Sequence, residues 1–331
     1  MASSSSELYP MKLSTIYIKK PWGGRTLEQY KGDLPEGLIG ETWDVSAQEQ
    51  GVTEVTNGRL RGRGLDRVTA ELGRSLLGSA SKSDLFPLMV RHVSSREPLS
   101  VQVHPTAEYA AAHGQCFGKD EAWYILDAEP GASVYAGAES ASEADFKEAV
   151  QQGTVRDLLV DLPVKAGDCL FIPAGMVHGI RAGVTLIEIC ENSNTTYRVF
   201  DYGRDRGLDL EETYANMDLT FTARTRRGLA VELEAATETL LCLQPSMAIA
   251  RLEIHGAQPQ HTLGESFHAV TCLAGEGSVT WPGGAVSIER GQSVLVPAGI
   301  EEYTVSGNLT VLRSWVPDLD RTRRELLAHT A

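Results

Sequence analysis

The sequence of 331 residues lacks a long apolar run, a closely spaced pair of cysteines and an excess of basic residues. No stretch approaches about 18 consecutive apolar residues, so we expect no membrane-spanning helix. The five cysteines are odd in number and widely spaced, which is typical of reduced thiols rather than of a disulfide framework. The chain begins Met1-Ala-Ser-Ser-Ser-Ser, without a basic or apolar signal region, and we expect a cytoplasmic protein.

The balance of charge is acidic, with 30 Lys and Arg against 44 Asp and Glu and a formal net charge of −14. We therefore expect neither nucleic acid nor an anionic membrane surface as a partner. An anionic small molecule would need a local cluster of cations, because the field of the whole chain repels it. Apolar residues make up 42% of the chain, which suffices for folded domains, and the length suits about two of them.

Glycine and proline are frequent, and 32 glycines and 14 prolines separate short β-branched or aromatic runs. This pattern is typical of an all-β barrel or sandwich. Helical spacing of apolar residues favours helices over residues 65–77, within 142–161 and over 210–217, the second opened by a capping-box-like Ser142-Glu-Ala-Asp145. Strands are predicted over residues 14–19, 88–93, 99–104, 122–126, 169–172, 185–190, 246–254, 269–273, 293–296 and 309–315.

An internal repeat divides the chain. Residues 166–183 read AGDCLFIPAGMVHGIRAG and residues 290–307 read RGQSVLVPAGIEEYTVSG, with glycine, an apolar strand and Pro-Ala-Gly recurring at a constant offset of 124. Proline stops the strand ladder and glycine takes the tight turn that follows. The repeat predicts two related barrels with a boundary near residues 225–245.

The polar residues of the two copies differ. His178 in the first copy corresponds to Glu302 in the second, and Glu121 corresponds to His268. The second copy also lacks a counterpart of the Gln-x-His segment at residues 102–104. The scaffold is kept and the polar set is not, so we place the active site in the first barrel.

A metal-binding pattern lies in this first barrel. Gly167-x5-Pro173-x-Gly175-x2-His178 resembles the second sequence motif of cupins, although its usual closing Asn is Ala182 here. The first cupin motif is represented by Gln102-Val-His104, whose side chains alternate onto one face of a strand, with Glu121 far downstream. One Gln, two His and one Glu suit Zn²⁺ and also accept Mn²⁺, Fe²⁺ or Co²⁺.

We therefore expect a mainly β protein built from two cupin-type β-barrels (jelly rolls) with helical insertions, the second barrel being degenerate. Residues 1–235 would form the catalytic, metal-binding cupin domain with its insertions. Residues 236–331 would form the degenerate C-terminal cupin-like β domain.

Seven sequence blocks resemble the type I mannose-6-phosphate (phosphomannose) isomerases, in particular their short bacterial form. The blocks follow the family order over about residues 14–205. They are Lys20-Pro-Trp-Gly-Gly24, Gly40-Glu-Thr-Trp43, Phe86-Pro-Leu, Pro98-Leu-Ser-Val-Gln-Val-His-Pro105, Gly118-Lys-Asp-Glu-Ala-Trp123, Ile172-Pro-Ala-Gly-Met-Val-His178 and Glu191-Asn-Ser-Asn-Thr-Thr-Tyr-Arg198.

The resemblance implies one Zn²⁺ per chain and a catalytic arginine, Arg198. It also places Lys119 on the family's lysine two residues before the metal-binding Glu. Two positions depart from the family pattern, since Arg91 stands where many members have Lys and Asn194 where many have Asp. The zinc ligands implied are Gln102, His104, Glu121 and His178.

The implied reaction interconverts mannose 6-phosphate and fructose 6-phosphate through a cis-enediol. Arg198 stays protonated and therefore suits stabilisation of the enediolate or of the phosphate rather than base catalysis. Lys119 and Arg91 are expected to contact phosphate or hydroxyl groups of the substrate, with Arg204 and Arg206 as weaker candidates. A metal-bound hydroxide, Glu41 and Glu191 all remain candidates for the general base.

Two other functions stay open at this point. Arg91 and Asn194 leave room for a relaxed sugar isomerase that acts on free or other phosphorylated aldoses. A non-catalytic cupin that binds a sugar is the alternative from a different class. In each case the expected partner is a small-molecule sugar or sugar phosphate, and we expect a monomer or a weak homo-oligomer.

Overall fold

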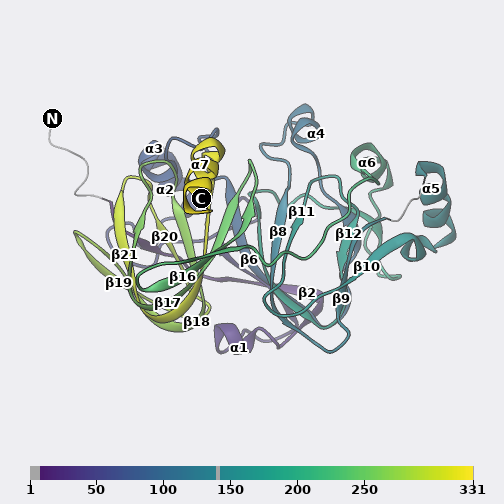
Figure 1. Ribbon diagram of the computed structural model, residues 1–331. Helices are drawn as coiled ribbons and strands as arrows, with labels where there is room; N and C mark the ends of the chain where they lie inside the picture. The colour runs from purple at the N-terminus through teal and green to yellow at the C-terminus, as the bar shows by residue number, and fades with distance from the viewer. Residues whose placement is uncertain (1–7, 139–141, 331) are drawn as a thin grey trace.

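The computed structural model describes residues 8–138 and 142–330 and consists mainly of antiparallel sheets. Figure 1 shows two halves side by side, with the teal strands of the N-terminal half facing the green and yellow strands of the C-terminal half. Among the described helices, none is long and apolar enough to cross a membrane.

Two sheets form the N-terminal barrel. They face each other, and the apolar side chains between them include Trp22, Trp123 and Ile125 of one sheet and Val134 and Ile180 of the other. The six-stranded sheet has the order β11 (Cys169–Ile172), β8 (Glu121–Ala128), β13 (Val184–Glu191), β6 (Leu88–Ser95), β3 (Ile39–Val45), β2 (Ile16–Gly24). The five-stranded sheet has the order β10 (Leu159–Pro163), β9 (Ser133–Ala138), β12 (His178–Ile180), β7 (Val101–Val103), β14 (Tyr197–Phe200).

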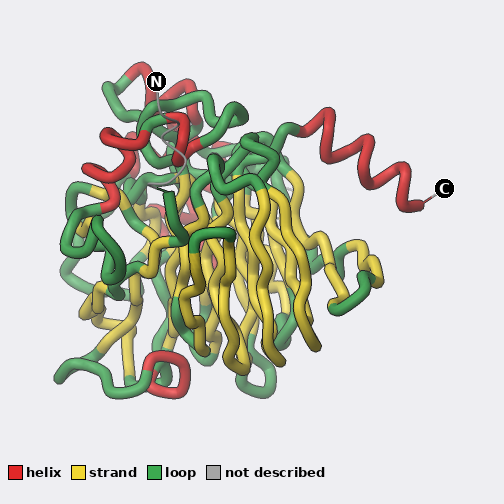
Figure 2. The backbone as a smooth tube through the Cα atoms, turned by 90° about the vertical axis from the view of Figure 1, so that its left-hand side faces the viewer, coloured by secondary structure: helices red, strands yellow, loops and turns green. Residues whose placement is uncertain are grey.

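One eight-stranded sheet forms the C-terminal half, and Figure 2 shows its long strands running side by side. The first strand of the chain joins this sheet, because Met11 pairs with Leu295. The order is β1 (Met11–Lys12), β20 (Ser293–Val296), β18 (His268–Trp281), β21 (Glu302–Trp315), β17 (Ala248–His261), β16 (Ala236–Leu243), β15 (Leu229–Glu232), with β19 (Gly284–Glu289) on β18. A short hairpin of β4 (Ala47–Gln48) and β5 (Gly51–Val52) completes the strands.

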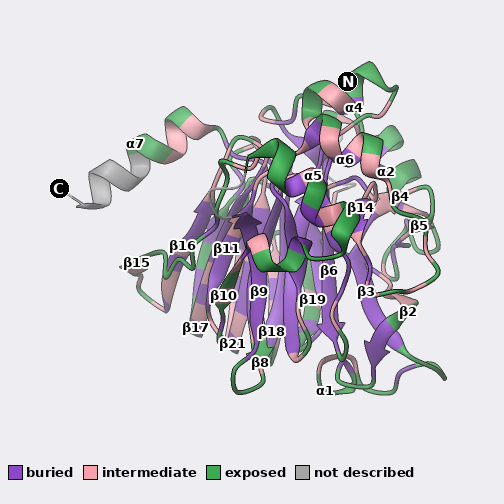
Figure 3. Cartoon of the chain, turned by 90° about the vertical axis from the view of Figure 1, so that its right-hand side faces the viewer, coloured by how far each residue is buried: buried purple, intermediate pink, exposed green. Residues whose placement is uncertain are grey.

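The largest apolar core joins the two halves. Leu88 and Ile187, on the outer face of the six-stranded sheet, pack with Met247, Ile249 and Leu312 of the C-terminal half. Figure 3 shows the resulting buried strands at the centre, with exposed residues gathered on the helices and loops. The six-stranded sheet is therefore covered on both faces, so polar side chains on its inner face are shielded from solvent.

Helices lie around the sheets. α5 and α6 cover the outer face of the five-stranded sheet, where Phe146 and Val155 pack with Val103 and Val199 (Figure 1). The predicted capping box at the start of α5 is confirmed, since Ser142 and Asp145 satisfy each other's backbone N–H groups. The helical elements are α1 (Glu28–Lys31), α2 (Leu65–Leu72), α3 (Arg74–Leu77), α4 (Ala107–Ala112), α5 (Glu143–Gln152), the 3₁₀ turn η2 (Val155–Leu158), α6 (Leu210–Asn216) and α7 (Leu319–Thr330).

Candidate active site

Three neighbouring strands of the five-stranded sheet carry a row of polar side chains. His178 of β12 lies directly opposite Gln102 of β7, and Gln102 lies opposite Arg198 of β14. Residues directly opposite each other in an antiparallel pair project from the same face. Gln102, His178 and Arg198 therefore project together from one face of this sheet.

The six-stranded sheet supplies the facing residues. Glu188 of β13 pairs with Arg91 of β6 on one side and with Trp123 of β8 on the other, and Cys190 pairs with Glu121. These residues share one face, and Trp123 on that face packs against the five-stranded sheet. Trp123 also donates its Nε1–H to Glu121 Oε2 at 2.9 Å, which fixes the carboxylate.

The four predicted ligands converge between the sheets. One ligand atom from each of His104, Glu121 and His178 lies within 4.8 Å of the other two. His104 Nε2 is 2.9 Å from Glu121 Oε1, and His178 Nε2 is 3.9 Å from Glu121 Oε2. The amide nitrogen of Gln102 lies 3.4 Å from His104 Nε2 and 3.2 Å from His178 Nε2.

The two imidazoles are held in the tautomer that a metal requires. His104 Nδ1 is 2.9 Å from the carbonyl of Thr195, and His178 Nδ1 is 2.8 Å from the carbonyl of Met176. A carbonyl only accepts, so both Nδ1 atoms carry the proton and both Nε2 atoms direct a lone pair at Glu121. Burial together with the Lys119 ammonium lowers the pKa of His104 to about 3, and burial also lowers the pKa of His178.

This donor set fits a divalent cation. Glu121 Oε1 is completely buried, and no donor among residues 8–138 and 142–330 is aligned to hydrogen-bond it. Two imidazole lone pairs and a carboxylate pointing at one another are stable only beside a cation or a proton, and without a metal that cation is the Lys119 ammonium, 2.9 Å from Glu121 Oε1. Rotation of the Gln102 amide by half a turn presents its oxygen to the same point, so the set offers two nitrogens and two oxygens, as zinc prefers.

Lys119 lies against the ligands. Its side chain is 1% exposed, and Nζ lies 2.9 Å from Glu121 Oε1 and 3.3 Å from His104 Nε2. Burial raises the pKa of Glu121, but Lys119, His104 and His178 together hold that pKa well below its ordinary value, with Lys119 contributing most of the three. Without a metal, Lys119 is therefore the cation that balances the buried Glu121 charge.

The chain's relatives agree with this architecture. Residues 11–155 match the model of the type I phosphomannose isomerase catalytic domain, and residues 245–316 match that of the mannose-6-phosphate isomerase cupin domain. The chain is 33% identical to the mannose-6-phosphate isomerase of Streptococcus mutans serotype c over 313 residues, which cover 92% of this chain and 98% of that protein. The chain belongs to the type I phosphomannose isomerase family.

Solved structures of phosphomannose isomerases share the fold. The crystal structure of the Bacillus subtilis mannose 6-phosphate isomerase aligns with a TM-score of 0.86 at 26% identity, over 92% of this chain and 99% of the other. A zinc-bound mannose 6-phosphate isomerase aligns with a TM-score of 0.70 at 16% identity, over 93% of this chain and 99% of the other. The predicted mainly β fold of the cupin type is confirmed.

Arg91 is enclosed by carboxylates in this phosphomannose isomerase. Its Nε donates to Glu188 Oε1 at 2.7 Å, and its Nη1 and Nη2 lie 3.3 Å from Glu41 Oε2 and 3.8 Å from Glu121 Oε1. Glu41 also pairs with Lys20 at 3.1 Å, and despite burial these two cations lower its pKa. Burial raises the pKa of Glu188 to about 7, against the opposing charge of Arg91.

Glu188 is the residue of this site that sequence reasoning missed. It is 2% exposed and lies on the inward face of β13, in the otherwise apolar run LIEIC at residues 186–190. A single acidic residue flanked by isoleucines on a predicted strand is the signal that could have identified it. Glu191, a candidate base, lies on the opposite face of β13, where it accepts from the backbone N–H of Asp120 at 3.0 Å.

The remaining predicted cations divide into two groups. Arg198 stays beside the ligands, 29% exposed, with Nη1 3.5 Å from Asp209 and a buried Nε that has no hydrogen-bond partner in the described part of the chain. Arg204 and Arg206 instead both pair with Asp201.

Proposed function

We propose that this phosphomannose isomerase interconverts mannose 6-phosphate and fructose 6-phosphate through a cis-enediol, with one Zn²⁺ per chain. The convergence of four buried or half-buried donors on one point carries the proposal. The name of the Streptococcus mutans relative and the zinc of the distant structural relative support it. The residues that would hold the ion are Gln102, His104, Glu121 and His178.

A bound divalent cation supplies a Lewis acid that favours the negative charge of an enediolate. The chain's own residues are already arranged to stabilise that negative charge. Glu121 and the two neutral imidazoles are fixed by Trp123 and by two backbone carbonyls, so little reorganisation is needed. Because these three ligands are almost completely buried, the substrate would approach from the side of the half-buried Gln102 and Arg198.

Arg198 is the proposed catalytic cation. Its guanidinium cannot lose its proton at physiological pH, so it would stabilise negative charge on the enediolate or on the phosphate. It projects from the sheet beside Gln102, and among the described residues its only ion pair is the long one with Asp209, at 3.5 Å. Much of its hydrogen-bonding capacity is therefore available to a ligand.

Lys119 and Arg91 would complete the substrate site. Lys119 already lies at the ligands, and a bound cation at Glu121 would release its ammonium toward a substrate oxygen. Arg91 is held by Glu188 and Glu41, so we assign it mainly to positioning these carboxylates and to adding positive charge behind the substrate. These residues belong to the proposed catalytic domain, residues 1–235.

The ion pairs that engage Arg91 favour a second candidate function, a relaxed sugar isomerase whose activity depends little on the phosphate group of the substrate. Arg91 is engaged by carboxylates, and Asn194 donates its amide to Gln50 at 3.3 Å. The deciding experiment compares kcat/KM for mannose 6-phosphate with that for mannose. The proposal expects a preference of at least about a hundredfold for the phosphorylated sugar, since a charged contact contributes a few kcal/mol. Equal values would establish the relaxed isomerase instead.

A further inference from the structure

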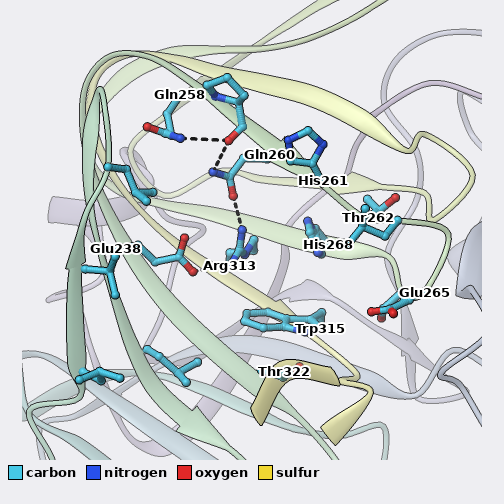
Figure 4. Close-up of a pocket in the computed structure, with 17 residues that line it drawn as sticks. Glu238, Gln258, Gln260, His261, Thr262, Glu265, His268, Arg313, Trp315 and Thr322 are labelled. Carbon is cyan, nitrogen blue, oxygen red and sulfur yellow. Dashed lines mark hydrogen bonds and ion pairs between the residues drawn. The ribbon is translucent and has the colours of Figure 1, made fainter. Parts of the chain in front are cut away.

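The C-terminal half contains a cavity of about 460 Å³, separate from the ligands of the N-terminal barrel. Figure 4 shows its polar residues, with Arg313 at the centre, Glu238 and Gln260 beside it and Trp315 below. Its volume lies in the range of small-molecule sites, roughly 300–1,000 Å³.

The cavity lies at the place in the second barrel that corresponds to the metal centre in the first. In the first barrel Glu121 begins β8 opposite Ile172, at the end of β11. In the second barrel His268 begins β18 opposite Val296, at the end of β20. The sequence repeat therefore extends to strand register, and His268 takes the position of Glu121.

A second pair follows the same register. Glu188 of β13 lies opposite Trp123, two residues after Glu121. Arg313 of β21 lies opposite Val270, two residues after His268. Glu121 and Glu188 of the first barrel are therefore replaced, one by an imidazole and one by a guanidinium. The described residues of this cavity include no cluster of metal-ligating groups.

Arg313 is fixed and partly unsatisfied. Its Nη2 lies 2.6 Å from Glu238 Oε1, its Nη1 donates to Gln260 Oε1, and its guanidinium lies 4.7 Å from the ring centre of Trp315. Its Nε is buried and has no hydrogen-bond partner within the described ranges. A buried donor without a partner is costly, so the Arg313 guanidinium is not fully satisfied by the protein residues around it.

Charge decides the class of ligand. Of the two carboxylates that line the cavity, Glu238 pairs with Arg313 and Glu265 pairs with Arg321, so the lining carries no net positive charge. Burial, with help from Arg313, holds the pKa of His268 well below its ordinary value, so its imidazole is neutral. An anion that approached Arg313 would be repelled by the neighbouring Glu238 and by the net charge of −14 of the whole chain.

We infer that the second barrel is a binding site for a small neutral polyhydroxylated ligand of the monosaccharide type, recognised by the Arg313–Glu238 pair, Gln260 and Trp315. The pair offers donors and acceptors to neighbouring hydroxyl groups, and Trp315 offers an aromatic wall to the apolar face of a sugar ring. This site is independent of the isomerase activity proposed above.

Saturation-transfer NMR with fructose and fructose 6-phosphate tests the inference. The His104→Ala/Arg198→Ala chain serves as parent, because it removes a proposed metal ligand and the proposed catalytic cation of the first site. We expect fructose to bind the parent more tightly than fructose 6-phosphate does. Trp315→Leu should weaken fructose binding by about tenfold, while the melting temperature stays close to that of the parent.

Glu238→Gln is the matched variant, because it keeps the shape and removes the charge that balances Arg313. It should shift the preference toward fructose 6-phosphate. Fructose binding that survives Trp315→Leu unchanged, or a parent that prefers the phosphate, would overturn the inference. If this parent does not fold, His178→Ala/Arg198→Ala replaces it, because it removes a different proposed ligand of the first site.

Discussion

Replacing Lys119 by methionine isolates the charge balance of the metal centre. Lys119 Nζ lies 2.9 Å from Glu121 Oε1, and both side chains are at most 1% exposed. Met fills nearly the same space as the lysine stem but carries no charge. In the metal-loaded protein the cation balances Glu121, so Lys119→Met should change stability little. After chelation the variant has lost the bound cation and the nearest side-chain cation, and among the described residues only Arg91, which is 3.8 Å away and shared with Glu188 and Glu41, remains beside this buried carboxylate.

The magnitude follows from the cost of an unpaired buried charge. Removing one partner of a buried ion pair costs about 3–5 kcal/mol. The simplest relief for Glu121 is to take up a proton, which costs about 3–4 kcal/mol at pH 7 for a carboxyl of ordinary pKa. A chain of 331 residues has an unfolding entropy of about 0.7 kcal/mol per degree. Chelation should therefore lower the melting temperature by about 4–7 °C more in Lys119→Met than in the wild type.

Differential scanning calorimetry with and without a chelator measures this difference. Lys147→Met is the matched control, because Lys147 forms an exposed pair with Glu143 and its removal should cost less than about 0.5 kcal/mol in either state. The excess effect of Lys119→Met should also shrink as the pH falls toward 4, where Glu121 takes up a proton at little cost. An equal fall in the wild type and in Lys119→Met would refute the assignment of Lys119 as the balancing cation.

Three further predictions concern activity, metal and pH. Arg198→Lys should lower kcat/KM by about 10²–10³. It should change the free energy of unfolding by less than about 1 kcal/mol, because the side chain is partly exposed. Steady-state kinetics and a melting curve measure the two effects, and an unchanged kcat/KM would remove Arg198 from the mechanism. A chelator should abolish turnover and Zn²⁺ should restore it, with about one zinc per chain by elemental analysis; full turnover without metal would contradict this. Burial raises the pKa of Glu191 to about 7, so the folded state binds the extra proton and loses up to about 3 kcal/mol of stability as the pH rises from about 4.5 to 7. Glu191→Gln should remove that slope in urea unfolding at pH 5 and pH 8, and a variant with the wild-type slope would exclude Glu191 as its source.

Strands bounded by local signals were predictable from sequence. The predicted strands at residues 169–172 and 293–296 match β11 and β20 to the residue, because glycine precedes each and proline ends each. The apolar face over residues 65–77 was also correct, but Gly73 adopts a φ of +48° and divides the segment into α2 and α3. The pairing of Met11 with Leu295 was not predictable, since local patterns carry no information on such distant register.

The candidate metal ligands could be proposed from the sequence because their spacing belongs to sequence motifs, whereas their surroundings depend on tertiary contacts. The role of Lys119 beside Glu121 follows from the way β8 enters the barrel, and no pattern in the sequence states it. The sequence gives no sign that Glu188 and Glu41 enclose Arg91, because these three residues come from three separate strands. The cavity around Arg313 likewise forms only when β16, β17 and β21 curve around it.

A crystal structure with anomalous diffraction data at the zinc absorption edge examines the metal centre most directly. We expect a single peak about 2.0–2.2 Å from the Nε2 atoms of His104 and His178 and from a carboxylate oxygen of Glu121, with the Gln102 amide oxygen turned toward it. A zinc-supplemented crystal with no peak between these residues, or with its strong peak elsewhere, would exclude the proposed zinc site.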